Sequence, residues 1–147
     1  MSQFARPDAD ITDGAWLNEA ASATDMYQSI DEDVSSPNDS DYVESEAGPS
    51  SSPVVFNLSA ITDPVSSSGH VMRWRRSKSG GGATLNLTVE LRQGYVNEGS
   101  PGTLIKTVSD SDIPNGFATT TATLSAGEAD AITDYSDLQV RIVATQV

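Results

Sequence analysis

The 147-residue chain contains no cysteine, only one histidine and few bases. Without cysteine, neither a disulfide nor a thiolate metal site can form. Signatures such as Gly-x-Ser-x-Gly and His-Glu-x-x-His are also missing, and the single His70 has no obvious nucleophile beside it. These absences predict a protein that is not an enzyme and that needs no cofactor.

Long apolar runs are missing as well. No stretch approaches the ~20 apolar residues that a membrane-spanning helix needs. The opening residues lack the basic, apolar and small-residue blocks of a signal peptide. We therefore expect a soluble protein that is made in the cytoplasm.

Charge is present, but it is strongly one-sided. The chain carries 21 acidic residues against 8 bases, a formal net charge of −13. Residues 1–50 hold 12 of the acids and only one base, Arg6. A molecule this negative is not expected to take nucleic acid or an anionic membrane as its main partner. The asymmetry predicts an acidic extended N-terminal arm, residues 1–52, and a near-neutral domain, residues 53–147.

The acidic segment is not purely polar, because apolar and aromatic residues interrupt it at intervals. An acidic tail without a docking role would have few aromatics. The Gly/Pro/Ser stretch 48–53 is typical of a linker between this segment and the domain. We therefore predict that the arm docks on a partner through four aromatic anchors, which are Phe4, Trp16, Tyr27 and Tyr42.

Short β-type segments follow the linker, at 53–60, 70–79, 83–94, 102–109, 117–125 and 138–147. In the clearest of them, 83–94, Leu85 to Leu91 alternate with polar residues from Asn86 to Arg92. Turns rich in Gly, Pro, Asn and Ser separate the segments. This pattern predicts an all-β fold, an antiparallel β-sandwich or jelly roll.

The closing stretch 123–147 gathers Glu128, Asp130, Asp134 and Asp137 within ten residues. Ser125 and Glu128 have the spacing of a capping box, which predicts one short helix before the last strand. The other three acids fit the end of that helix and an Asx turn. We interpret the group as a structural corner rather than as a catalytic or cation site.

Two other groups of charges have more than one interpretation. In the strand at 70–79, alternation places Met72 and Trp74 inside and Arg73 and Arg75 outside. The two arginines fit a solvated strand face, a protein interface or, less well, a nucleic-acid patch. Acidic pairs such as Asp110 and Asp112 suggest calcium, but none continues into an EF-hand loop.

Several motifs resemble β-sandwich modules of structural proteins in tailed bacteriophages. The stretch "TLSAGEADAITDYSDLQVRI" (123–142) is similar to the closing segment of such modules, and "ITDPVSSSGHVMRWRRSKSGGGATLNLTVELRQG" (61–94) is similar to their central part. "FARPDADITDGAW" and "IDEDVSSPNDSDYV" resemble their opening. The segments 95–106 and 39–53 depart from the pattern. The resemblance implies a virion structural protein and leaves capsid and tail open.

The favoured hypothesis is a capsid decoration, or cement, protein on the outer surface of the virion, synthesised in the host cytoplasm. Its expected partners are the major capsid protein and other copies of itself, as a homotrimer. Arg73 and Arg75 would form one docking face, and the arm would reach across neighbours. The alternative is a glycan-binding recognition module of the tail or a fibre, for which Tyr95 is the best contact residue.

Overall fold

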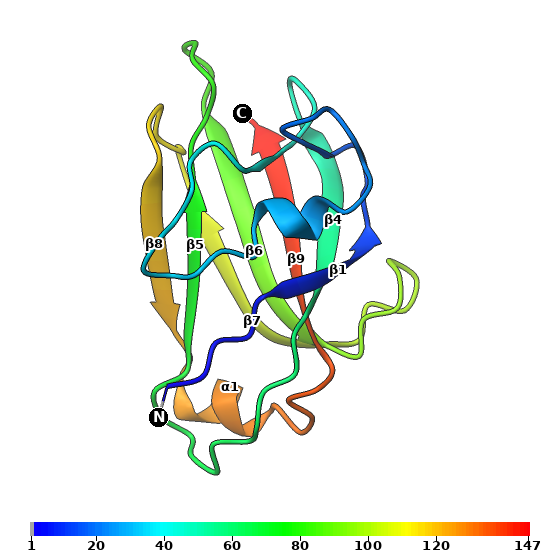
Figure 1. Ribbon diagram of the computed structural model, residues 1–147, viewed down its shortest axis with the longest axis vertical. Coiled ribbons are helices and arrows are strands. Elements are labelled where there is room, and N and C mark those ends of the chain that lie inside the picture. Colours follow the sequence, from blue (N-terminus) through cyan, green and yellow to red (C-terminus); the bar gives the residue numbers. More distant parts are fainter. Residues whose placement is uncertain (1) are drawn as a thin grey trace.

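Strands account for most of the regular structure in the computed structural model, which describes residues 2–147 (Figure 1). The one α-helix among these residues is short, so the all-β prediction is confirmed. A sandwich or jelly-roll topology stays a prediction. The elements are β1 (Pro7–Thr12), β2 (Leu17–Asn18), the 3₁₀ helix η1 (Met26–Ser29), β3 (Val43–Glu44), β4 (Ser50–Leu58), β5 (Val71–Arg76), β6 (Leu85–Gln93), β7 (Thr103–Asp110), β8 (Ala118–Thr123), α1 (Ala126–Asp130) and β9 (Leu138–Gln146).

The strands pair antiparallel in one large and two small sheets. The large sheet has the order β1-β4-β9-β6-β7. β5 pairs only with β8, and β2 pairs only with β3. Each strand after β3 falls within or close to a segment with period-2 or β-branched character, which is why the pattern located them.

One face of the large sheet carries the hydrophobic core, in two clusters. On β6 the alternation turns Leu87, Val89 and Leu91 inward, as the sequence predicts. The first cluster lies around Leu91 and includes Ile105 and Tyr135. Met72, on the inner face of β5, packs against it. The second cluster lies over β4 and β9 and contains Trp16, Met26, Val54, Phe56 and Ala144.

The N-terminal segment supplies part of this core and is not an extended arm. β1 pairs with β4 from Pro7↔Leu58 to Thr12↔Val55, so it is the edge strand of the large sheet. Residues 13–46 then fold over the sheet, and Figure 1 shows η1 in front of β6, β9 and β4. The linker expected at 48–53 also differs, since β4 already begins at Ser50. Burial of the apolar residues explains the difference, because they cover a sheet face that would otherwise meet water.

A carboxylate fixes η1 against β1. The two side-chain oxygens of Asp10 accept hydrogen bonds from the backbone N–H groups of Met26 and Tyr27, both at 2.8 Å. These donors at the start of a helix have no partner within it. Met26 is thereby held fully buried in the second cluster.

The helix predicted after Ser125 is present, and its capping box is confirmed. The Ser125 hydroxyl accepts from the Glu128 N–H at 3.3 Å, and the Glu128 carboxylate accepts from the Ser125 N–H at 2.6 Å. The same carboxylate binds Lys106 of β7 at 2.9 and 3.0 Å. α1 is therefore tied to the large sheet by an ion pair as well as by packing.

Candidate functional site

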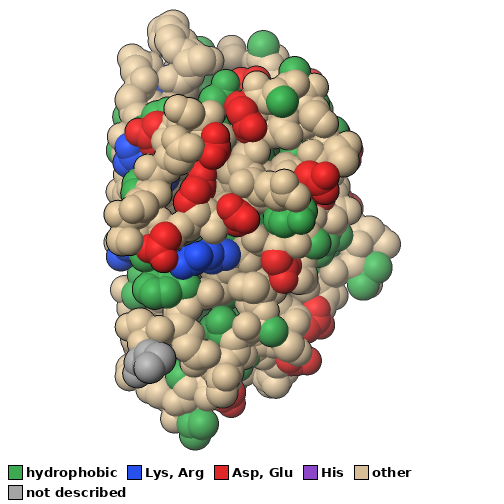
Figure 2. Space-filling model, in the orientation of Figure 1, with side chains coloured by type: hydrophobic (Ala, Val, Ile, Leu, Met, Phe, Trp, Pro, Cys, Tyr) green, Lys and Arg blue, Asp and Glu red, His purple; other side chains and the backbone are tan. Residues whose placement is uncertain are grey.

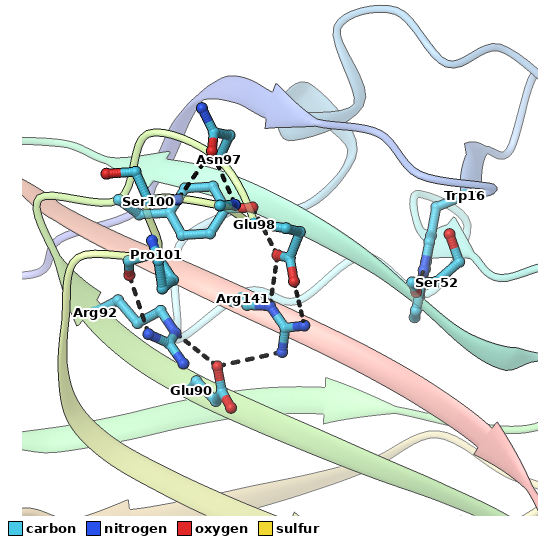
Figure 3. Close-up of polar contacts among 11 residues, drawn as sticks. Trp16, Ser52, Glu90, Arg92, Asn97, Glu98, Ser100, Pro101 and Arg141 are labelled. Carbon is cyan, nitrogen blue, oxygen red and sulfur yellow. Dashed lines mark hydrogen bonds and ion pairs between the residues drawn. The ribbon is translucent and has the colours of Figure 1, made fainter.

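A charged network lies on the face of the large sheet opposite the core (Figure 3). Glu90 of β6 and Arg141 of β9 are directly paired in the register. The Glu90 carboxylate accepts from Arg92 at 2.7 Å and from Arg141 at 3.3 Å. Arg141 also binds both carboxylate oxygens of Glu98, at 2.9 and 2.8 Å. Each arginine is mostly covered, so the network clamps the loop 94–102 onto the sheet rather than offering charge to a ligand.

Tyr95 belongs to this clamp and does not present itself to a glycan. Its side chain is 4% exposed, and its hydroxyl donates to Glu98 at 2.7 Å. Its backbone N–H donates to the buried side chain of Gln139 at 2.9 Å. Burial, together with the Glu98 carboxylate, raises the pKa of the Tyr95 hydroxyl. The sequence-based choice of Tyr95 as a glycan contact is therefore wrong.

The four predicted aromatic anchors are separated by the structure. Trp16 is 6% exposed in the core, and its indole N–H donates to the carbonyl of Ser52 at 2.9 Å (Figure 3). Tyr27 is partly buried and packs against the same cluster, and Tyr42 is also partly buried. Phe4 alone is exposed, at 53%. In this fold the anchors Trp16 and Tyr27 serve the chain's own core.

Acidic residues of the N-terminal segment likewise meet arginines of the same chain. Asp39 accepts from the Nε and one terminal nitrogen of Arg75, at 2.5 and 2.6 Å. Asp33 accepts from Arg6 at 2.7 Å. The pKa of Asp39 is lowered by its bonds to Arg75, and that of Asp33 by bonds from Ser35 and then from Arg6. The segment is held down by charge where it is not held by apolar packing.

The outer face of β5–β8 is the strongest candidate for a docking surface. It consists of the exposed side chains of Val71, Arg73 and Arg75 on β5 and, directly paired with them, three exposed threonines on β8. Arg75 also lies over the ring of Phe117, with 5.5 Å from the guanidinium carbon to the ring centroid. Arg73 makes no ion pair with any residue in 2–147, so its charge is available to a partner. The three threonines are Thr119, Thr121 and Thr123.

The inner face of β5 carries a different polar group, which the sequence did not reveal. Asp110 of β7 accepts from the indole N–H of Trp74 at 3.2 Å and from Arg76 at 3.0 Å. Burial alone would raise the pKa of Asp110, but the bonds from Arg76 and Trp74 outweigh it and lower the pKa. Trp74 is therefore an inward residue, as predicted, and it links β5–β8 to the large sheet.

Three of the four acids of the closing stretch accept hydrogen bonds from groups close to them in sequence. Glu128 caps α1, Asp134 accepts from Ser136, and Asp137 accepts from Gln139 at 2.8 Å. Asp130 lines a shallow hollow of about 410 Å³ together with Asp63 and Tyr135. Within residues 2–147, no group of three or more His, Asp or Glu side chains is arranged to hold a metal ion.

Residues 2–147 thus form an all-β protein. Most of the polar groups described above hold loops and helix ends in place, and the outer face of β5–β8 exposes arginine, threonine and valine side chains. Neither helix among residues 2–147 has the length and apolarity that a bilayer span requires. Comparison with protein-family models, with curated proteins and with solved structures gave no match to this chain.

Proposed function

We propose that the protein is a non-enzymatic structural protein of a tailed-bacteriophage particle, a decoration protein of the outer capsid surface. The virion assignment comes from the sequence resemblance described above. The observation that carries the binding mode is the outer face of β5–β8, where Arg73 is exposed and has no ion-pair partner among residues 2–147, on a chain of net charge −13.

The proposed docking surface is the β5–β8 face and not the N-terminal arm that the sequence suggested. An arm that reaches across neighbours would have to withdraw Trp16 from the core, which is costly. The strand face needs no such rearrangement, because Val71, Arg73 and the threonines of β8 are already exposed. Arginine suits a protein interface because its planar group makes paired bonds to carboxylates.

The expected partner surface is therefore an acidic or carbonyl-rich patch on the major capsid protein. Figure 2 shows acidic side chains spread over the face where Figure 1 draws the N-terminal segment, and this face would remain turned to solvent. Many copies on one shell would add weak individual contacts into stable attachment.

The first test is the number of copies per purified particle, measured against the major capsid protein. A fixed simple ratio with hundreds of copies supports decoration of the shell. A handful of copies contradicts it and moves the protein to the tail, where binding to a glycan array becomes the next measurement.

The second test separates the docking face from general charge. Arg73→Gln should weaken binding to particles that lack the protein by about tenfold, the effect of losing one central interface arginine. Arg6→Gln is the control for charge, because it removes the same charge from a residue outside strands β5 and β8, one that is paired with Asp33. Equal effects of both variants would mean that net charge, and not the β5–β8 face, governs binding.

A further inference from the structure

Within residues 2–147, the large sheet ends in the edge strands β1 and β7, and both strands of the β5–β8 sheet are edge strands. Each of these four strands has one side without a partner strand. Natural proteins protect such edges with charges, proline or irregular register, since an open edge can pair with another chain. β1 contains Pro7, two aspartates and two register shifts. β7 contains Lys106 and a register shift, and β5 contains Arg73 and Arg75.

β8 has none of these protections. Its sequence, Ala-Thr-Thr-Thr-Ala-Thr, has no charge and no proline, and its pairing with β5 runs from Arg76↔Ala118 to Val71↔Thr123 without a shift. Threonine is among the residues that favour strands most. Figure 1 shows β8 at the margin of the molecule, with no strand beyond it, and the turn that carries Asp39 lies over the face of this sheet, where Asp39 binds Arg75. Along its open side, this edge is the least guarded of the four.

The hydrogen-bond pattern identifies the backbone groups at that open edge. The N–H of Leu124 donates to the carbonyl of His70 at 3.0 Å, which makes 70 and 124 a hydrogen-bonded pair. In an antiparallel ladder, hydrogen-bonded and non-bonded pairs alternate. The N–H and C=O groups of Thr119, Thr121 and Thr123 therefore point away from β5. No backbone partner outside the β5–β8 ladder is found for them among residues 2–147.

We propose that this edge pairs with the same edge of a second copy, antiparallel and about a two-fold axis at Thr121, which gives a dimer in place of the homotrimer expected from the sequence. Thr121 would face its counterpart, and Thr119 would face Thr123 of the other copy. The β5–β8 sheets of the two copies would then join into one continuous four-stranded sheet, in the order β5-β8-β8-β5. All six open backbone groups of each β8 strand would gain a partner.

A second copy fits this edge because the side chains there are self-complementary. The pairing brings threonine opposite threonine at every outward position, and such pairs stabilise antiparallel sheets. The two copies of Arg73 would lie three strand spacings apart, about 14 Å. That distance exceeds the screening length of about 10 Å at 0.1 M salt, so their repulsion is small.

Pairing of β8 with β5 of another copy is less favourable. It would leave each copy with one open edge, so assembly would continue into a filament rather than close. It would also use the edge strand that carries Arg73 and Arg75. Natural proteins place charged residues on edge strands to prevent such pairing. The two-fold arrangement closes and leaves both arginines on an exposed face.

The size of the contact sets its strength. A six-residue edge buries less than the roughly 1,000 Å² that a stable interface needs. The dimer is therefore weak and concentration-dependent in solution, and it gains strength only where copies are held close together, as on a shell. The inference concerns the isolated chain, so it does not rest on the virion assignment.

The test is analytical ultracentrifugation of the full-length protein over a range of concentrations. Wild type should show a concentration-dependent dimer, whereas Thr121→Lys and Thr121→Asp should each raise its dissociation constant at least about tenfold, because like charges would meet at the axis. Mixing the two variants should restore a heterodimer. Thr107→Lys is the control, an exposed threonine on the β7 edge that should leave self-association unchanged.

A wild-type protein that stays monomeric, or a Thr121→Lys variant that dimerises like wild type, would overturn the proposal. So would a mixture of Thr121→Lys and Thr121→Asp that remains monomeric. These results are separable from the shell-binding test. If dimerisation is absent while Arg73→Gln still loses shell binding, the proposed function survives alone.

Discussion

At the scale of single residues, Arg141 is the most consequential charged side chain. It joins Glu90 on the sheet to Glu98 on the loop 94–102, and its side chain is 16% exposed. Arg141→Met should lower the free energy of unfolding by about 2–3 kcal/mol, because it leaves a largely covered Glu90 with only Arg92 as partner. Urea denaturation of the purified variant measures this directly.

The control for that prediction is the same substitution on the exposed strand face. Arg73→Met removes an arginine that makes no ion pair within residues 2–147, so unfolding should change by no more than about 0.5 kcal/mol. If Arg73→Met costs as much as Arg141→Met, the clamp described for Glu90 and Glu98 is not what stabilises the loop.

Sequence reasoning identifies residues whose contacts are local and misses those whose contacts are distant. Ser125 and Glu128 lie three residues apart, so the capping box could be predicted from spacing alone. Glu98 and Arg141 lie 43 positions apart and meet only once β6 and β9 have paired. The outward alternation of Glu90 and Arg92 is the one signal in the sequence that points to this network.

At the scale of elements, the N-terminal segment is as much a part of the core as any strand. Trp16→Ala should cost about 3–5 kcal/mol of unfolding free energy, because it opens a cavity over Val54 and Phe56. Phe4→Ala removes an aromatic that is 53% exposed and should change stability little. Chemical denaturation of both variants, followed by circular dichroism, gives the comparison.

The two variants also test whether the segment acts as an arm. A docking arm would make Trp16→Ala nearly as harmless to the isolated protein as Phe4→Ala, since both residues would await a partner. A large cost for Trp16 alone supports the packed arrangement. Equal small costs would contradict it.

The difference between predicted and missed elements has a physical cause. β5, β6 and β9 alternate with a period of two, and this pattern reports directly on a half-buried strand. β1 reads Pro-Asp-Ala-Asp-Ile-Thr and lacks strand character, because its place in the sheet depends on pairing with β4. One of its two aspartates has another role, since Asp10 caps η1. For this reason, composition alone predicted an extended arm where the N-terminal segment in fact packs on the sheet.

At the scale of the whole molecule, the acidic composition sets how stability depends on pH. Most of the shifted carboxyls have a lowered pKa because arginine, lysine, hydroxyl or backbone groups bind their charged form. These are Glu19, Asp33, Asp39, Glu98, Asp110, Glu128 and Asp134. Glu32 is the exception, because burial raises its pKa, as do the charges of Asp41 and Asp31.

These opposite shifts predict a stability maximum on the acid side of neutrality. As the pH falls from 7, the folded chain protonates Glu32 before the unfolded chain does, so stability first rises. Below about pH 4.5, the unfolded chain takes up protons that the folded chain still excludes from carboxyls such as Glu98 and Asp110, so stability then falls. The urea midpoint, measured from about pH 8 to pH 3, should pass through this maximum.

The variant Glu32→Gln isolates the rising part of the curve. It keeps the shape of the side chain but removes its proton uptake and its repulsion from Asp31 and Asp41. The variant should be more stable than wild type at pH 7, its midpoint should no longer rise as the pH falls, and its acid limb should stay in place. A wild-type midpoint that only declines from pH 7 downward would contradict the prediction, as would a rise that persists unchanged in Glu32→Gln. The second outcome would assign the rise to the relief of the overall charge of −13 instead of to the one partly buried carboxyl of Glu32.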